Sequence, residues 1–215
     1  EGEEEGARPR WGRFNDEERL RAALIEFQIK HTNNQFLERV MPSTAQMRSA
    51  GRKDLLSALH RYGGVEAVAG RLNMISSKHY AYHAEFLTVL RELRAYLRES
   101  GEEGMMPTMK QLVDDGRGDL RKLITKHGGM RVMAARLDLR LSRGRSDLVW
   151  GPFDLDFAIE VLEYAHMLAL ESDGGDGIRM PTAAELTSLG RNDVDEKVIE
   201  YGGYSEVARR LGMDT

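Results

Sequence analysis

Residues 41–74 read MPSTAQMRSAGRKDLLSALHRYGGVEAVAGRLNM. The same pattern returns without a gap at residues 106–139, MPTMKQLVDDGRGDLRKLITKHGGMRVMAARLDL, and at residues 180–213, MPTAAELTSLGRNDVDEKVIEYGGYSEVARRLGM. We call these segments modules 1, 2 and 3. A repeat of this length indicates that one supersecondary unit was used three times, and this restricts the architecture before any single motif is weighed.

The pattern inside each module predicts three short helices. A hydroxyl residue followed three positions later by Gln or Glu is a capping box, which marks the start of a first helix that ends near a glycine. The aspartate after the Gly-Arg dipeptide can cap the second helix and oppose its dipole. The first glycine of a Gly-Gly pair suits the left-handed end of that helix, and the second lets the chain turn into a third helix. The capping pairs are Ser43 and Gln46, Thr108 and Gln111, Thr182 and Glu185, and the aspartates are Asp54, Asp119 and Asp193.

The segments before the modules, residues 16–31, 79–99 and 154–171, also carry helical apolar spacing. A module of 34 residues is too small to be comfortably stable alone, so we expect each long helix to pack on the module that follows it. The predicted fold is all-α, with three tandem homologous units, each a long helix plus a three-short-helix module. The predicted boundaries are a disordered acidic tail at 1–10, units at 11–76, 77–142 and 154–215, and a linker at 143–153 that Trp150 and Phe153 can anchor on a neighbour.

The composition narrows the classes of function. The 215 residues include no cysteine, which excludes disulfides, thiolate zinc sites and a thiol nucleophile. No apolar run reaches the roughly 18 residues of a membrane helix, so we expect no membrane partner. His79 and His83 have a metal-compatible spacing but no evident third ligand. No phosphate loop, nucleophile elbow or catalytic carboxylate pair stands out, so we expect no enzyme, no cofactor, no metal and no small-molecule substrate.

The pattern MPT…L…GR.DL…I…GG…VA.RLG resembles a repeat of nucleus-encoded organellar proteins of plants and green algae, found in some of them beside a polyketide-cyclase or START-like domain. It is also distantly similar to the helix-turn-helix repeats attached to some homing endonucleases. The resemblance covers all three modules. It implies residence in a plastid or mitochondrion, with any targeting segment absent from this chain, and a binding role in organelle gene expression.

Two arginines recur in every module, one after the glycine that closes the first helix and one near the end of the third helix. They can hold phosphates, because helix-start N–H groups lie beside the first set. They can equally pair with the local aspartate or cap helix ends, and this structural interpretation stays open beside the first. The first set is Arg52, Arg117 and Arg191, and the second set is Arg71, Arg136 and Arg210.

Charge distinguishes the modules. Module 1 has five Lys/Arg and two acidic residues, module 2 has seven and four, and module 3 has four and six. If the protein binds nucleic acid, modules 1 and 2 should form the contacts, and module 3 should contact protein or cap the array. The difference in charge is explained equally well if these residues lie on solvent-exposed faces whose sequences diverged without selection for binding. The candidate nucleic-acid contacts are Arg52, Lys53, Arg71, Arg117, Arg121, Lys122, Arg131 and Arg136.

The second and third helices around Gly-Gly also permit a helix-turn-helix, with residues 65–72 and 130–137 as recognition helices. Trihelical packing without DNA contact fits the same pattern. The leading expectation is therefore a non-enzymatic helical-repeat protein of an organelle that contacts nucleic acid, RNA rather than DNA, through modules 1 and 2. The alternative is a protein–protein scaffold or a structural subunit of a large assembly such as a ribosome or polymerase.

Overall fold

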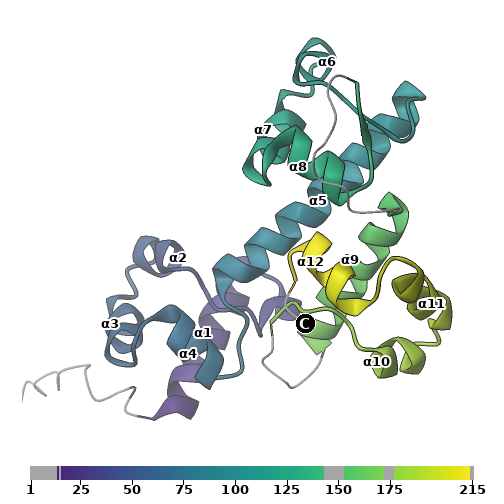
Figure 1. The fold of residues 1–215 in the computed structure, drawn as a ribbon. Helices are drawn as coiled ribbons and strands as arrows, with labels where there is room; N and C mark the ends of the chain where they lie inside the picture. Colours follow the sequence, from purple (N-terminus) through teal and green to yellow (C-terminus); the bar gives the residue numbers. More distant parts are fainter. Residues whose placement is uncertain (1–13, 15, 143–152, 172–176, 214–215) are drawn as a thin grey trace, which may run out of the picture. The chain divides into compact units, whose positions relative to one another are not determined.

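The computed structural model describes residues 14, 16–142, 153–171 and 177–213, and this part of the chain is mostly helical (Figure 1). The all-α prediction is confirmed. The predicted tail at 1–10 and residues 143–152 of the predicted linker, Trp150 among them, lie outside the described residues. In chain order the elements are α1 (Glu17–Thr32), η2 (Gln35–Leu37), α2 (Thr44–Ser49), α3 (Lys53–Arg61), α4 (Val65–Arg71), α5 (Ser77–Ser100), β1 (Met105–Met106), α6 (Met109–Asp114), α7 (Gly118–Lys126), α8 (Gly129–Arg136), β2 (Arg140–Leu141), α9 (Leu155–Glu171), α10 (Ala183–Ser188), α11 (Asn192–Glu200) and α12 (Tyr204–Leu211).

The chain divides into two compact units. Unit 1 comprises residues 1–80 and 169–177, and unit 2 comprises residues 81–168 and 178–215. Module 1 lies in unit 1, whereas modules 2 and 3 share unit 2. Compact packing therefore separates module 1 from the other two modules, which pack together.

All three modules begin with the expected cap. In each one the hydroxyl side chain accepts from the backbone N–H three residues on, and the Gln or Glu side chain accepts from the backbone of the cap residue. The second helix differs from expectation at its start, because its N-cap residue is the arginine and the aspartate sits in the first turn. The aspartate still faces the positive end of the helix dipole.

Left-handed backbone recurs at four places per module. The glycine after the first helix has φ near 70° in every copy, and both residues of each Gly-Gly pair have positive φ, as predicted for the first of them. The fourth place follows the third helix, where φ is 51° at Asn73, 52° at Asp138 and 68° at Gly212. Asn and Asp tolerate this region better than other side chains do, so the fourth place does not demand glycine.

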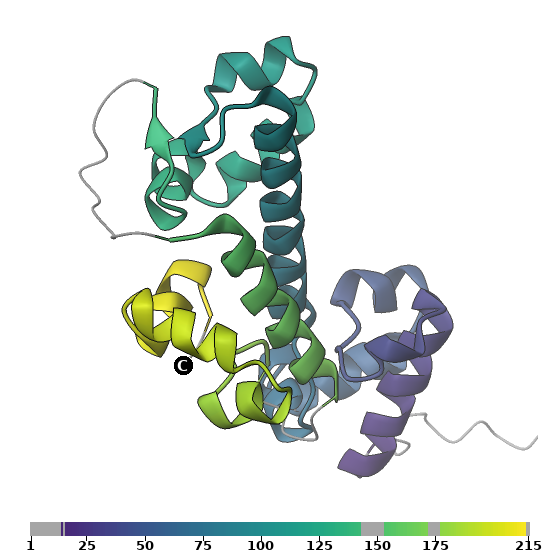
Figure 2. The same cartoon turned by 90° about the vertical axis from the view of Figure 1, so that its right-hand side faces the viewer.

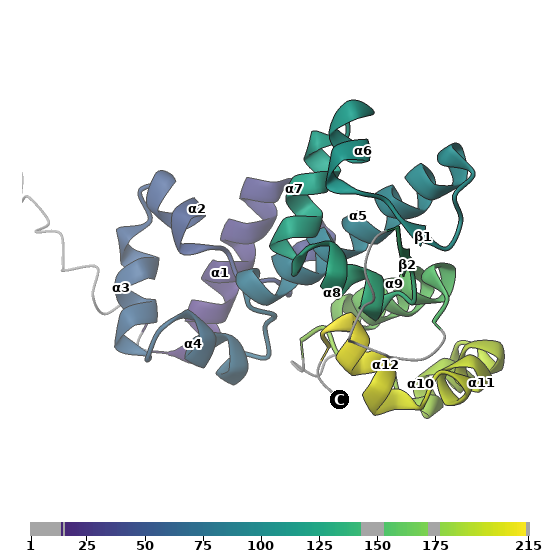
Figure 3. The ribbon, with the colours of Figure 1, turned by 45° about the horizontal axis from the view of Figure 1, so that its top comes forward.

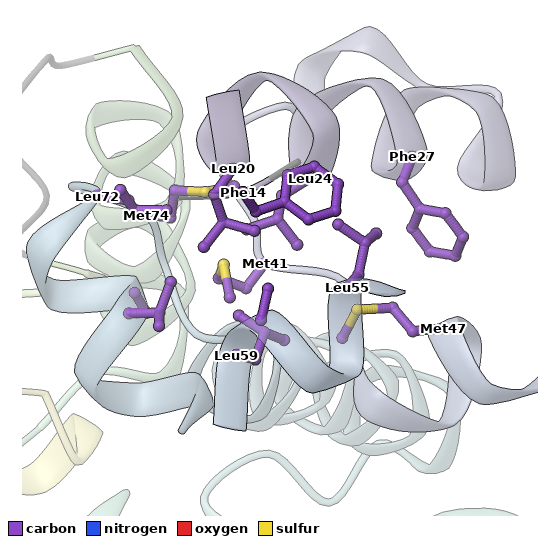
Figure 4. Packing of buried hydrophobic residues seen from close by; sticks show 13 residues of the cluster. Phe14, Leu20, Leu24, Phe27, Met41, Met47, Leu55, Leu59, Leu72 and Met74 are labelled. Carbon is purple, nitrogen blue, oxygen red and sulfur yellow. The ribbon is translucent and has the colours of Figure 1, made fainter. Parts of the chain in front are cut away.

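The core of unit 1 forms between α1 and module 1. One stripe of α1 places Leu20, Leu24 and Phe27 against Met41, Met47, Leu55 and Leu59, and Phe14 lies in the same cluster beside Leu20 and Leu24 (Figure 4). These side chains are at most 4% exposed. The expectation that a long helix buries its apolar stripe on the following module is confirmed here.

In unit 2, α5 and α9 run antiparallel (Figure 2). Ion pairs join the exposed edges of these two helices. Arg91 meets Glu163 at 2.6 Å, and Asp156 accepts from both Arg94 and Arg98, at 2.6 and 3.0 Å. Exposed pairs of this kind contribute little each, so the stability of unit 2 rests on the apolar stripes of the two helices. Those stripes include Phe86 and Leu90 of α5 and Phe157 and Val161 of α9, all at most 1% exposed.

In module 1, and separately in module 2, the chain segment that enters the module pairs with the segment that leaves it through a short parallel β-type contact, which we call the parallel tie. Val40 bridges to Ile75 around module 1, and β1 pairs with β2 around module 2, where both strands are labelled in Figure 3. Two-residue strands give too little alternation to be recognised in a sequence, and the apolar residues concerned, such as Val40 and Ile75, are ambiguous as a pattern. The tie brings the entry and exit of each of these modules side by side.

Candidate nucleic-acid interface

The arginine of the Gly-Arg dipeptide is held by the chain itself. Arg52 grips Asp54 with two hydrogen bonds of 2.9 and 3.0 Å, and Arg191 grips Asp193 with bonds of 2.8 and 2.7 Å. Arg117 lies 3.6 Å from Asp119 and donates to Glu92 at 2.6 Å. Planar guanidinium groups favour such paired contacts with a carboxylate. The first set of repeated arginines therefore pairs with acidic side chains of the protein itself, as the structural interpretation expected.

The same arginines also connect each module to its long helix. Arg52 lies over the ring of Phe27 in α1 at 5.7 Å, Arg117 reaches Glu92 in α5, and Arg191 contacts Glu160 and Tyr164 in α9. Arginine suits this position because it stacks on an aromatic face and binds a carboxylate at the same time. The repeated arginine thus connects the start of the second helix of each module to the long helix that precedes the module.

The anion position at the start of the second helix is already occupied. The Arg52 side chain lowers the pKa of Asp54, and backbone N–H groups at the helix start add to this effect. Arg191 lowers the pKa of Asp193 to about 2, and the backbone N–H of Leu120 lowers that of Asp119. A phosphate at these helix starts would have to displace an ionised side chain, so we exclude them from the interface.

The second repeated arginine is in contact with an aromatic ring in every module. Arg71 lies 5.3 Å from the centre of the Tyr62 ring, Arg136 4.2 Å from Phe86 and Arg210 4.8 Å from Phe153. Arg136 is only 7% exposed and Arg210 only 1%. Arg71 is half-exposed, donates to the Tyr62 carbonyl and lies 3.5 Å from Glu17. Phe153 is 7% exposed and packs against the rings of Phe157 and Tyr201.

Arg136 also connects modules 2 and 3. Its Nε donates to the carbonyl of Arg210 in the last turn of α12, where carbonyl groups lack partners within the helix. Burial lowers the pKa of Arg136, and the neighbouring Tyr82 side chain opposes that effect. A guanidinium enclosed in this way is inaccessible to a phosphate, so Arg136 leaves the set of candidate contacts.

The helix-turn-helix interpretation of module 2 fails on burial. In α8, Met133, Ala134 and Ala135 are buried together with Arg136. A recognition helix must present one free face to the major groove. In module 1 the exposed residues of α4 are Glu66, Ala67, Gly70 and Arg71, which offer one cation and one anion. Neither third helix presents a basic face.

The outward face of α7 carries two of the remaining candidates. Arg121 and Lys122 are exposed and form no ion pair within the described part of the chain. Lys126, one turn further on, is 65% exposed and pairs with Glu85 at 2.7 Å. Lys53 is exposed at the start of α3 with no ion pair among the described residues, and Arg131 is exposed at the start of α8. Of the eight candidates, Lys53, Arg121 and Lys122 therefore remain available to an external phosphate, and Arg131 at least reaches the surface.

Comparison of the chain with protein-family models, with curated proteins and with solved structures found no match. Within the described ranges no three metal-binding side chains gather, and no helix is long and apolar enough to span a bilayer.

His127 ends α7 at the position that tyrosine occupies in modules 1 and 3, and it packs as an aromatic residue 5.2 Å from Phe86. Its Nε2 meets Glu85 at 3.1 Å, while Nδ1 is buried without a hydrogen-bond partner among the described residues. Burial lowers the pKa of His127 below its ordinary value of 6.5, Arg136 and Lys126 act in the same direction, and Glu85 opposes them. The folded protein thus favours the neutral ring.

This lowered pKa predicts a pH effect on stability. Below about pH 6.5 the unfolded chain binds a proton that the folded chain binds only at lower pH, so the His127 contribution to stability is lost as pH falls through that window. His127→Tyr should lose less stability than the wild type between about pH 7.5 and pH 5 in urea unfolding followed by circular dichroism. Equal losses in the two proteins would contradict the assignment, and Tyr62→His provides the reverse substitution in module 1.

Proposed function

We propose that the protein is a non-enzymatic helical-repeat protein that binds nucleic acid through the outward face of α7, with Arg121 and Lys122 as its central contacts. The observation that carries this proposal is that these two cations are exposed and form no ion pair among the described residues, while the arginines common to all modules are occupied internally. Lys53 and Arg131, both exposed, extend the candidate set. Contacts of lysine and arginine with phosphate supply most of the sequence-independent affinity for nucleic acid.

RNA is the preferred ligand class. The buried face of α8 leaves no third helix in module 2 for the major groove of B-DNA, which is where base sequence is read in a duplex. A flexible single strand can place its phosphates against exposed cations on a short helix, and this requires no helix to enter a groove. Residence in a plastid or mitochondrion belongs to the same proposal, and the motif resemblance supports it.

We further propose that the three modules with their long helices descend from one unit. Capping boxes, left-handed positions and the arginine contact with the preceding helix recur in all three. On this proposal residues 77–142 and 154–215 are two copies that share one core, and residues 11–76 are the third. The units thus provide a scaffold on which exposed residues changed separately.

Binding can be tested by fluorescence anisotropy with a labelled single-stranded RNA and a DNA duplex of equal length. Arg121→Glu/Lys122→Glu should weaken RNA binding about tenfold or more at about 100 mM salt, and log affinity of the wild type should fall linearly with log salt. Lys30→Glu/Lys78→Glu makes the same change in net charge with exposed residues of unit 1 and should bind as the wild type does. Equal loss in both variants, or no RNA binding by the wild type, would rule the proposal out.

A second candidate function, a protein scaffold, is favoured by apolar side chains on the surface of unit 2. Ile199 is 64% exposed and Val113 is 50% exposed. Ile199 occupies the helix position that His60 and Thr125 hold in modules 1 and 2. This alignment was a usable sequence signal, because polar residues in two copies indicate a solvent-facing position.

A further inference from the structure

The outward face of α11 combines an exposed apolar side chain with acids that lack an ion pair. Ile199 stands three residues after Glu196 and directly before Glu200, and both glutamates are exposed. Neither glutamate forms an ion pair within the described ranges of the chain. Covering one isoleucine removes a solvent-exposed apolar surface, but the two acids require a partner that brings positive charge.

The outward face of α7 has the opposite charge at the same helix positions. Both helices have nine residues and begin after an N-cap arginine, so their faces have equal spacing. Arg121, Lys122 and Lys126 of α7 stand where Asp195, Glu196 and Glu200 stand in α11. If the two helices lie antiparallel, Lys122 faces Glu200 and Lys126 faces Glu196, because each pair is separated by one helical turn.

These two faces do not satisfy one another within a chain. Both belong to unit 2, and the side chains that would meet, Arg121, Lys122 and Lys126 on one face and Glu196 and Glu200 on the other, are exposed there. Arg121, Lys122, Glu196 and Glu200 are without ion-pair partners in the described residues. The complementary surface that either face requires is therefore available on another molecule of the same sequence.

We propose that the α11 face of one chain docks on the α7 face of a second copy of this chain. The contact joins two different surfaces, so it is heterologous, and each chain keeps one free face of each kind after docking. The association therefore continues beyond a dimer at high concentration. Exposed ion pairs contribute about 0.2–1 kcal/mol each and are screened by salt, so the self-association is weak and sensitive to ionic strength.

Sedimentation velocity across a concentration series tests the proposal on the full chain. At about 20 mM salt the weight-average sedimentation coefficient should rise steadily from about 10 μM to about 1 mM protein, and at about 500 mM salt the rise should disappear. Ile199→Ser should reduce the rise at low salt without changing the net charge. A wild type that stays monomeric at low salt throughout the series would overturn the proposal.

Charge-swapped variants identify the two faces. Glu196→Lys/Glu200→Lys and Arg121→Glu/Lys122→Glu should each be monomeric alone, because the two faces then carry like charges. An equimolar mixture should associate again, because each face meets an opposite charge on the other variant. Glu38→Lys/Glu66→Lys provides the matched control in unit 1 and should associate as the wild type does. A monomeric mixture, or association of either swapped variant alone, contradicts the proposed interface.

These experiments separate self-association from nucleic-acid binding. Glu196→Lys/Glu200→Lys leaves every cation of α7 in place and adds positive charge, so this variant should bind RNA at least as tightly as the wild type while it loses self-association. Arg121→Glu/Lys122→Glu should lose both properties. If only self-association fails, the wild type still binds RNA but stays monomeric; if only RNA binding fails, the wild type still associates but does not bind RNA.

Discussion

Replacing Arg136 with alanine should lower the free energy of unfolding of unit 2 by about 2–3 kcal/mol. Hydrogen bonds from a charged donor contribute about 1.5–3 kcal/mol, and a desolvated cation–π contact adds up to about 2 kcal/mol, while release of a buried charge offsets part of the loss. The Arg136 side chain stacks on Phe86 and caps the end of α12, so both contacts disappear together.

Arg71→Ala is the matched control for this prediction. Arg71 holds the same position in module 1, but its side chain is 47% exposed, and we expect a loss below about 1 kcal/mol. Arg136→Met should recover part of the loss, since it keeps an apolar stem over Phe86 and removes the buried charge. Urea unfolding followed by circular dichroism measures all three variants. A loss below about 0.5 kcal/mol in Arg136→Ala would mean that the arginine behaves as a surface residue.

Replacing Gly128 with alanine should cost about 3 kcal/mol, the sum of two effects. Gly128 has φ 106°, and a Cβ atom there would lie 2.9 Å from Cγ1 of Val132. The left-handed region costs a non-glycine residue about 1–2 kcal/mol, and overpacking adds about 1–3 kcal/mol. Val132 cannot move aside easily, because a β-branched side chain in a helix has one strongly preferred rotamer.

Gly116→Ala separates the two contributions. Gly116 has φ 72°, and a methyl group added there would meet open space, since nothing lies within 4 Å of that position. We expect it to lose about 1–2 kcal/mol from the backbone alone. The double variant Gly128→Ala/Val132→Ala should be less destabilised than the sum of Gly128→Ala and Val132→Ala measured separately. If Gly128→Ala were no worse than Gly116→Ala, the contact with Val132 would carry no strain.

The helices of this fold could be predicted from sequence because local chemistry determines them. Ser43 with Gln46 specifies a helix start within four residues, and Gly63 after Tyr62 specifies an end. The grouping of modules into two units is not local in this sense. It depends on contacts such as Arg136 with Arg210, which are 74 residues apart and leave no periodic trace in the chain.

The candidate site was less predictable for the same reason. Arg52 and Arg121 are both cations close to the start of a second helix, and composition treats them alike. Only the structure distinguishes Arg52, which grips Asp54, from Arg121, which has no ion pair among the described residues. Selecting candidates because they recur in every module picked out the arginines that maintain the fold. Residues that bind a ligand can differ from one module to the next, so recurrence does not identify them.

The parallel tie has a consequence for how such a chain can grow or shrink. The backbone N–H of Met41 donates to the carbonyl of Ile75, and the N–H of Ile75 donates to the carbonyl of Arg39, both at 2.8 Å. The polypeptide therefore leaves and rejoins its path at neighbouring points around module 1. A module tied in this way can be inserted into a chain without separating the backbone ends at the point of insertion.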